Sequence, residues 1–445
     1  MHRYVLQGLM ELRQNYWFWP SVLTIAAVIL GVGVPAIDRV IGGAWMDQTG
    51  LLRAIQVDGA RSLLATLAAA VLGVAGVSFS ITIVAVSFAS GTFGPRLVGN
   101  FMRDRTNQVV LGIFLGTFVY CITVLGTVHD ATGEGGSAGL PTFVPQLAIM
   151  LAQAFTLASV GALIYFIHHV PESINIMNLA ARIGHALRET LSKRPEEREE
   201  TTLDGPPDRN EPARDVTAAT TGYLTEIDIE RLHKLADEND IDVVLDRTAG
   251  DFVLAGELVL VARPRGLAKE VDPDEFATCI AIGPERTADQ DELFLADELV
   301  EIIGRALSPG TNDPHTAITC LDWVRAALAA FARGCPGGEW RRHGHVTYRR
   351  ITFESLTAHV FGRVRQYVAS DRNATLHALE VLTTVALAAP LSRRHAVAAE
   401  AGALASAAAD ALPSASARDE VALAHKAFQR RLAEGRVHRS LERAA

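Results

Sequence analysis

The chain has 445 residues, enough for two or three domains, and it is strongly apolar, with 49% hydrophobic and only 20% charged residues. It carries 41 Lys and Arg against 50 Asp and Glu, a formal net charge of -9. The acidic excess lies after residue 170, which removes the electrostatic basis for binding nucleic acid. A basic nucleic-acid-binding protein is thereby excluded.

Four long stretches without Asp, Glu, Lys or Arg predict four membrane-spanning helices. A helix needs about 20 apolar residues to cross about 30 Å of hydrocarbon, and every stretch reaches that length. Buried helices of a soluble protein rarely stay uncharged for so long, least of all four times in succession. The predicted spans cover residues 17–37, 62–94, 107–128 and 144–170, and the membrane domain that contains them is expected over residues 1–191.

Arginine residues that flank the spans predict their orientation. The second loop contains Arg96, Arg103 and Arg105, and basic residues also precede the first span and follow the fourth. On the other side of the membrane, the first loop contains Arg39, Arg53 and Arg61, and the third loop has no Lys or Arg. Because positive loops stay inside, we expect both termini on the cytoplasmic side of a bacterial inner membrane. The three arginines are interpreted as topology determinants that contact lipid headgroups.

Small and hydroxyl-bearing residues form two stripes on the second predicted span. At about 100° per residue, they fall on opposite sides of the helix, and small residues let helices approach closely. The second span is therefore expected to be an inner helix, whose stripes are either ordinary packing surfaces or, on one side, the lining of a pore at the axis of a homo-oligomer. No Asp, Glu, Lys or Arg lies within the spans, so any conduction is expected to be passive. The first stripe contains Gly73, Gly76, Ser80, Ser87 and Gly91 and is called the outer stripe below. The second stripe contains Ser78, Thr82, Ala85 and Ala89 and is called the inner stripe.

After the spans, the sequence predicts an α+β cytoplasmic domain. A charged, proline-bearing stretch at residues 192–215 has the composition of a disordered linker. Short runs of β-forming residues between glycine turns predict a β-rich module over residues 216–285, which partly resembles a barrel-sandwich fold without the lysine that would carry a cofactor. Apolar residues at spacings of three and four predict a helical bundle over residues 286–445. The part from Val216 onward is expected to fold on its own as a soluble domain.

Local patterns place the helices of this domain more closely. Capping-box patterns predict helix starts at Thr225, with Asp228, and at Thr287, with Gln290. The basic stretch over residues 341–350 predicts a turn or hairpin. Five further helices are expected over residues 314–331, 353–369, 373–389, 393–412 and 417–434.

The stretch SPGTNDPHTA, at residues 308–317, has two interpretations. Asp313 followed by Pro314 is a strong helix start, which makes the stretch a turn between two helices. Capping does not account for the other polar residues, which gather at a helix N-terminus where free amides favour a ligand. The alternative is therefore a small-ligand loop made of Thr311, Asn312, Asp313, His315 and Thr316.

No motif in the chain predicts catalysis or a cofactor. There is no phosphate-binding loop, nucleophile motif or C-x-x-C pair. The pairs His168-His169 and His343-x-His345 each supply two imidazoles, but neither has a Cys or paired carboxylate nearby at ligand spacing. We therefore expect no cofactor, no metal site and no enzyme activity. The chain has four cysteines, Cys121, Cys279, Cys320 and Cys335. The last three lie in the predicted cytoplasmic part, where we expect reduced thiols.

Several segments resemble a bacterial family of predicted membrane proteins, domain of unknown function 2254. The most distinctive is RTADQDELFLADELVEIIGRALSPGTNDPHTAITCLDW, followed by VSFSITIVAVSFASGTFGPRLVGNFMRDR in the second span and TGYLTEIDIERL with GDFVLAGE further on. The resemblance implies the architecture but brings no established activity, substrate or catalytic residue. Two functions are therefore considered: an oligomeric channel-like membrane protein with a cytoplasmic ligand-sensing domain, which could take a small ligand or ion, and a membrane-anchored scaffold or sensor whose spans only anchor and associate.

Overall fold

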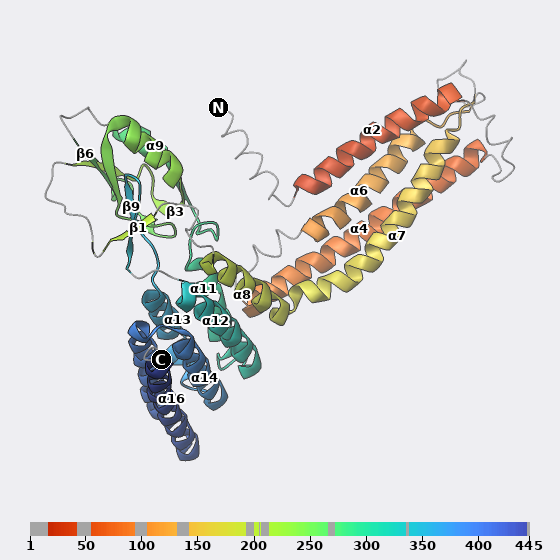
Figure 1. Cartoon of the computed structure of the whole chain (residues 1–445). Coiled ribbons are helices and arrows are strands. Elements are labelled where there is room, and N and C mark those ends of the chain that lie inside the picture. Colours follow the sequence, from red (N-terminus) through yellow and green to blue (C-terminus); the bar gives the residue numbers. More distant parts are fainter. Residues whose placement is uncertain are drawn as a thin grey trace. The chain divides into compact units, whose positions relative to one another are not determined.

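The computed structural model describes residues 17–41, 55–93, 105–130, 142–192, 200–203, 205, 213–265, 272–334 and 338–442. The chain forms two compact units, Met1–Asn175 and Ile176–Ala445. The first consists of long helices, and the second combines sheets with a helical bundle (Figure 1).

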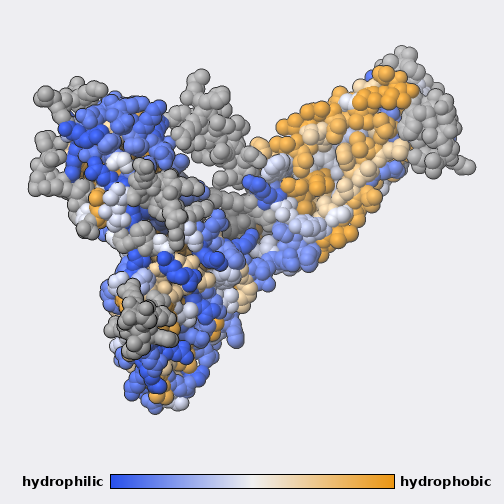
Figure 2. Space-filling model, viewed as in Figure 1, coloured by the Kyte–Doolittle hydropathy of each residue, from blue (hydrophilic) through white to orange (hydrophobic). Residues whose placement is uncertain are grey.

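Four apolar helices build the first unit, each long enough to cross a membrane, which confirms the four predicted stretches. Hydrophobic residues cover their visible surface (Figure 2). The third helix is the inner one, because half of its apolar window is buried within the unit against 22% for each of the others. Within one copy of the chain, the expectation that the second span is the inner helix is therefore wrong. The four helices are α2 (Phe18–Ile41), α4 (Val57–Phe93), α6 (Arg105–Leu125) and α7 (Gln146–Ile174).

Two glycines let α6 pack directly against α2. A Cβ atom at Gly112 would lie 2.6 Å from a methyl carbon of Leu23, and one at Gly116 would lie 3.3 Å from the carbonyl oxygen of Leu23. Gly112 and Gly116 are four residues apart, so they share one face of α6 and allow close contact between the two backbones. On another side of α6, the hydroxyls of Thr117 and Ser159 form a buried hydrogen bond of 3.0 Å to α7.

The second unit begins with α8 (Ile176–Ser192), which follows α7 after Asn175. The apolar face of α8 buries Leu179, Ile183 and Leu187, and a Cβ atom at Gly184 would lie 2.5 Å from the Cβ of Trp323. Helix α8 thus belongs to the core of the second unit, although the composition of the chain placed it in a membrane domain ending at residue 191. Helix α8 packs against α11 (Phe294–Ala306) and α12 (Pro314–Gly334). The further helices of the second unit are α13 (Phe353–Val368), α14 (Arg372–Ala388), α15 (Arg394–Ala411) and α16 (Ala415–Glu442).

Two sheets form the β-rich part of the second unit. The larger sheet receives a hairpin, β8–β9, from the segment between α12 and α13, and β9 runs parallel to β4 with Val346 beside Val243. The β-rich part is therefore not confined to residues 216–285, and the barrel-sandwich interpretation is not confirmed. The larger sheet has the order β1 (Glu200–Leu203), β8 (Trp340–His343), β9 (Val346–Arg349), β4 (Ile241–Leu245), β6 (Leu258–Pro264) and β2 (Arg214–Thr217); the smaller has the order β5 (Phe252–Val253), β3 (Gly222–Ile227) and β7 (Ile280–Gly283).

The segment expected to be a disordered linker, residues 192–215, contains strand β1 and the start of strand β2. Strand β1 lies inside residues 192–215 and pairs antiparallel with β8, with Leu203 beside Trp340. The polar composition of ETTL gave no sign of this strand, because backbone hydrogen bonds to a neighbouring strand stabilise it. Most other residues of the expected linker lie outside the described part of the chain.

Neither Thr225 nor Thr287, the two predicted N-cap residues, caps a helix in the described structure. Thr225 belongs to β3, and α9 (Ile229–Asn239) is capped by Asp228, whose carboxylate accepts a hydrogen bond from the amide of Arg231 at 3.1 Å. Thr287 and Gln290 precede α11, and the Gln290 side chain bonds both backbone groups of Ile227, at 2.9 and 3.3 Å. Of the four predicted capping residues, Asp228 alone caps a helix in the described structure, whereas the side chains of Thr225, Thr287 and Gln290 form tertiary contacts instead.

Candidate functional site

The outer stripe lies on the surface of the first unit. All five of its residues are exposed, and a Cβ atom at Gly73, Gly76 or Gly91 would meet no atom within 4 Å. The inner stripe faces the other helices, because Ser78, Thr82 and Ala89 are buried. Hence only one of the two predicted stripes has its neighbours within a single copy of the chain.

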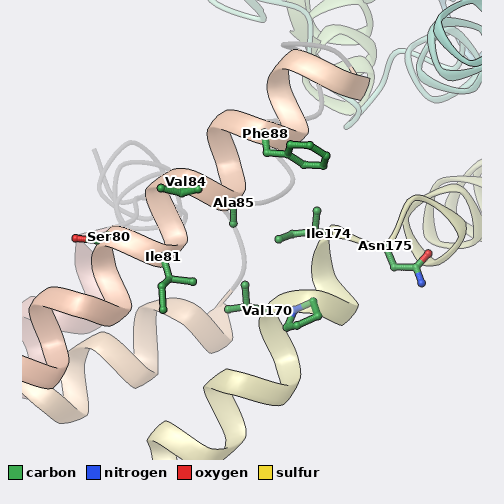
Figure 3. Close-up of a pocket in the computed structure, with 9 residues that line it drawn as sticks. Ser80, Ile81, Val84, Ala85, Phe88, Val170, Ile174 and Asn175 are labelled. Carbon is green, nitrogen blue, oxygen red and sulfur yellow. The ribbon is translucent and has the colours of Figure 1, made fainter. Parts of the chain in front are cut away.

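Between α4 and α7, at their C-terminal ends, the first unit is hollowed into a groove of about 710 Å³. Apolar side chains of both helices line it, with Ile81, Ala85 and Phe88 on one side and Val170 and Ile174 on the other (Figure 3). Such a lining suits a hydrocarbon chain or an apolar helix. Its polar residues are Asn175 and Ser80, and the Ser80 hydroxyl donates to the carbonyl of Gly76 in its own helix.

The polar loop of residues 308–317 is a closed turn in the structure. The Asp313 amide donates to the carbonyl of Ala306 at 2.7 Å, and the Asn312 amide donates to the carbonyl of Ser308 at 2.9 Å. Asn312 has φ of +47°, a left-handed conformation that asparagine adopts more readily than most residues. The backbone of the loop is thus held by its own hydrogen bonds.

Asp313 caps α12 as the sequence predicts. Its carboxylate accepts a hydrogen bond from the Thr316 hydroxyl at 2.6 Å and another from the Thr316 amide at 3.2 Å. The Thr316 hydroxyl lowers the pKa of Asp313, and the backbone amides of Thr316 and His315 add to the effect. Thr311, Asn312 and His315 are exposed, whereas Thr316 is buried. The turn therefore accounts for Asp313, Asn312 and Thr316, and a ligand bound at this loop stays a prediction.

A cluster of ionisable side chains surrounds the buried carboxylates of Asp291 and Asp297 around the start of α11, and sequence reasoning did not predict it. Arg286 donates to Asp291 at 2.6 Å and to Asp297 at 2.7 Å. From α13, His359 lies 2.7 Å and Arg363 3.1 Å from the second oxygen of Asp297. His359 and Arg363 are four residues apart and so share one helix face. These five residues are called the Asp297 cluster below.

The electrostatics of the Asp297 cluster favour the charged forms of its central groups. Burial by itself raises the pKa of Asp297, but the hydrogen bonds from His359 and Arg286 outweigh it and lower the pKa to about 2. Burial likewise acts to lower the pKa of Arg286, which the two carboxylates raise. Every charge has an opposite partner, so the cluster is built as a structural junction between α11 and α13 rather than as a reactive centre.

The loop arginines and the cysteines named from the sequence lie partly within the described residues. Of the three loop arginines, Arg105 begins α6, while Arg96 and Arg103 lie outside the described residues. Cys121, Cys279 and Cys320 are free thiols in the interior, and burial raises the pKa of Cys320 to about 12. Cys335 lies outside the described residues. The described cysteines are therefore protonated and shielded.

The fold defines a class: a membrane protein with four apolar helices, followed by a mixed unit of sheets and helices. Comparison with known proteins agrees with this class, since the family model "Predicted membrane protein (DUF2254)" matches residues 13–384. The chain belongs to the DUF2254 family.

Relatives of the chain come from mycobacteria. It is 30% identical over 378 residues to the uncharacterized protein Rv1290c of Mycobacterium tuberculosis (strain H37Rv) and to the uncharacterized protein Mb1321c of Mycobacterium bovis. Both matches cover 82% of this chain and 71% of the relative. No solved structure matches the chain.

Proposed function

We propose that the chain is a channel-like membrane protein that works as a homo-oligomer, with the outer stripe of α4 at the contact between copies. The second unit is then a regulatory or ligand-sensing domain on the cytoplasmic side of a bacterial inner membrane. The observation that carries the proposal is the exposed row of glycines and serines along α4.

Lipid-facing positions elsewhere on α4 carry large apolar side chains. Leu72, Val77 and Phe79 are exposed in this way, whereas the outer stripe has glycine and serine between them. Glycine costs a helix interior about 1 kcal/mol relative to alanine, so several glycines on one exposed face need a compensating contact. The close approach of a second helix supplies such a contact.

Among the described residues, bulky aromatic side chains fill the interior of the first unit in one copy. Phe114 and Tyr120 of α6 and Phe166 of α7 are buried within the first unit. The Asp38 carboxylate accepts hydrogen bonds from two amides of α7, which gives it a structural role at the start of that helix. Conduction, if it occurs, therefore takes place between copies and is passive.

The orientation rests on the described basic residues at the ends of the spans. Arg105 starts α6, and Arg182 and Arg188 lie in α8, after the fourth span. The positive-inside rule places these ends in the cytoplasm. The second unit follows the fourth span and is proposed on the same side.

Cysteine cross-linking in native membranes tests the proposed contact. In a background whose native cysteines are replaced by alanine, Ser80→Cys and Ser87→Cys should give disulfide-linked dimers on mild oxidation. Phe79→Cys is the matched control, because Phe79 is adjacent in depth but lies about 100° around the helix. Equal cross-linking of Phe79→Cys and Ser80→Cys would reject the outer stripe as an interface.

Flux measurements in proteoliposomes test the channel itself. Wild-type protein should pass small ions, and Ser80→Leu or Ser87→Leu should abolish that flux while the oligomer, measured by cross-linking at another stripe position, persists. Absence of flux from the wild type under all conditions tried would overturn the channel.

The scaffold or sensor remains the second candidate, and one observation favours it. The Ser80 hydroxyl donates to the carbonyl of Gly76 in its own helix at 2.9 Å, so it does not need water or an ion as a partner. Cross-links at the outer stripe combined with no flux would select this function.

A further inference from the structure

A second groove, of about 490 Å³, lies between α6 and α7 on the surface of the first unit. Helix α6 lines it with Val109, Val110 and Ile113, and α7 lines it with Ala158 and Gly161. Spacings of three and four residues place these positions on a single side of each helix. None of them lines the groove between α4 and α7. This second hollow is called the α6–α7 groove below.

Small residues of α7 create the hollow. The neighbouring positions Leu157, Val160 and Ile164 carry large apolar side chains that are exposed on the surface of the unit, whereas Ala158 and Gly161 leave space between the two helices. A Cβ atom at Gly161 would meet no atom within 4 Å. The described part of the chain therefore leaves the groove open at this position.

The two ends of the groove differ in polarity. At the inner end, one turn beyond Ile113, the hydrogen bond between Thr117 and Ser159 joins the helices. At the outer end, Arg105 and Tyr165 line the opening. From Arg105 to Ile113 the groove follows α6 for about 12 Å, which is close to the roughly 15 Å of hydrocarbon in one leaflet.

The outer end offers hydrogen-bond donors to an anion. Arg105 is exposed, and no carboxylate of the described residues pairs with it. Its guanidinium matches the geometry of a phosphate with two parallel N–H donors, and the Tyr165 hydroxyl is a further donor. The His169 ring stacks on that of Tyr165, with the centroids 5.5 Å apart. Glu172, two turns beyond Tyr165, has a partner of its own in His168, 3.4 Å away.

The charge at the opening decides between two occupants of the apolar part. An apolar helix from a second copy would leave Arg105 without a counter-charge. An anionic phospholipid brings both a hydrocarbon chain for the groove and a phosphate for the arginine. Basic pockets between transmembrane helices bind anionic headgroups in this way, and tyrosine is enriched at the depth of the headgroups.

We propose that the α6–α7 groove binds one acyl chain of an anionic phospholipid, and that Arg105 and the Tyr165 hydroxyl hold its phosphate. A general contact between Arg105 and headgroups, as the sequence predicts, requires no groove and no particular lipid. With the orientation proposed above, the lipid belongs to the cytoplasmic leaflet, whose anionic headgroups attract basic residues. The site is independent of whether the first unit conducts ions.

Dioleoylphosphatidylglycerol is the probe for the test, and dioleoylphosphatidylcholine, which has the same chains and a neutral headgroup, is the matched control. The full chain is purified in detergent, stripped of lipid and titrated, with the unfolding temperature and native mass spectrometry as readouts. One phosphatidylglycerol per chain should bind about fivefold more tightly than phosphatidylcholine and raise the unfolding temperature. Glycerol 3-phosphate, which lacks the chains, should leave the unfolding temperature unchanged.

Filling the groove tests the site of the acyl chain. Gly161→Leu should weaken the binding of phosphatidylglycerol by about tenfold or more, because the new side chain takes the place of the hydrocarbon. Gly33→Leu is the matched control, since a Cβ atom at Gly33 of α2 also meets nothing within 4 Å, and it should bind the lipid as the wild type does. Ala158→Leu obstructs the same groove and replaces Gly161→Leu if that variant is unfolded.

Headgroup selectivity tests the outer end. Arg105→Gln should remove the roughly fivefold preference for phosphatidylglycerol over phosphatidylcholine, whereas Arg39→Gln, which changes an exposed arginine in the last turn of α2, should keep it. Tyr165→Phe retains the stacked ring and should weaken the binding of phosphatidylglycerol by about threefold. Unfolding temperatures without lipid check that each variant is folded, and only variants that match the wild type there are compared.

Two results would overturn the site. One is a wild-type chain that binds phosphatidylglycerol no more tightly than phosphatidylcholine. The other is unchanged binding of phosphatidylglycerol in folded Gly161→Leu or Ala158→Leu. If such a variant also loses the contact between copies in cross-linking, the groove holds a helix of a second copy instead of a lipid.

Discussion

The carboxylate of Asp38 in α2 accepts a hydrogen bond of 3.1 Å from the amide of Ala148, in the first turn of α7. A second bond of 3.3 Å comes from the amide of Leu147. The residue before α7, Pro145, provides no side-chain cap, so the cap of this helix comes from another helix. Asp38 is buried, and its negative charge lies at the positive end of the α7 dipole.

Asp38→Ala should therefore destabilise the first unit. The lost cap and the two buried amides left without partners should lower the unfolding free energy by about 1 to 3 kcal/mol. Thermal unfolding of the full chain in detergent measures the effect. Asp58→Ala is the control, because Asp58 lies in the first turn of α4 but is exposed. Equal losses in the two variants would show that the buried cap contributes nothing specific.

The closed turn before α12 predicts opposite effects for two neighbouring substitutions. Asn312→Gly should leave stability unchanged or raise it slightly, because glycine adopts a left-handed φ without strain, whereas Asn312→Ala should cost about 1 kcal/mol. The φ of +47° at Asn312 is the cause of this difference. Denaturation midpoints of the two variants decide the matter.

A ligand at the same loop has its own test. Any ligand that raises the melting temperature through Asn312 should lose that effect in Asn312→Gly, whose fold is preserved. Asp313→Ala should cost about 0.5 to 2 kcal/mol through the lost cap with or without ligand. If a ligand still raises the melting temperature of Asn312→Gly, it does not bind through Asn312, and the loop serves only as a turn between two helices.

The Asp297 cluster predicts a specific sensitivity to acid. The pKa of Asp297 falls from its ordinary value of 3.8 to about 2 in the folded chain, so folding favours the ionised carboxylate. Its stabilising contribution is complete above about pH 4 and is lost as the pH falls from about 4 to about 2. Asp297→Asn should flatten the stability profile in that range.

At neutral pH the same substitution should destabilise the second unit by roughly 3 to 5 kcal/mol, because Arg286 stays buried with one partner fewer. Glu301→Gln is the control, since it removes only the more exposed ion pair with Arg305, for which a loss below about 1 kcal/mol is expected. Unfolding temperatures of the full chain between pH 2 and 7 test both variants. An unchanged acid profile in Asp297→Asn would contradict the assignment.

Two glycines with positive φ allow the cost of backbone strain to be measured separately from the cost of a steric clash. Gly250 has φ of +94° and Gly256 has φ of +84°, so alanine at either position costs about 1 to 2 kcal/mol of backbone strain. A Cβ atom at Gly250 would also overlap the Asp291 carboxylate, whereas one at Gly256 would meet nothing within 4 Å. Gly250→Ala should therefore be the more destabilising by at least about 1 kcal/mol in chemical denaturation. Equal losses of stability in the two variants would mean that the Asp291 side chain of the Asp297 cluster moves aside at no cost in free energy.

The features that the sequence predicted are those with a local cause. The spans follow from length without charge, and α12 follows from Asp313 and Pro314, because each requirement is met within a few consecutive residues. The capping box at Thr225 failed for the converse reason, since Thr225 lies at a bulge of β3 and its hydroxyl donates to the carbonyl of Ala281 in β7 at 3.2 Å. A local pattern is decisive only where no distant partner competes for the same groups.

Features with a distant cause stayed hidden. Asp38 and Ala148 are 110 positions apart. The same holds for β1, which is stabilised by pairing with β8. The candidate loop at Asn312 was recognised from the sequence, whereas the Asp297 cluster required the folded chain.

Helix α8 determines where the chain can be cut. Its buried face includes Leu179 and Leu187, and its partner α12 presents Trp323 to Gly184. A fragment that starts at Val216 lacks α8 and would expose this apolar surface to water, which promotes aggregation. A fragment that starts at Ile176 keeps the surface covered. We expect residues 176–445 to be monodisperse in size-exclusion chromatography and residues 216–445 to aggregate, so the helix that leaves the last span is a structural part of the second unit rather than an attachment to it.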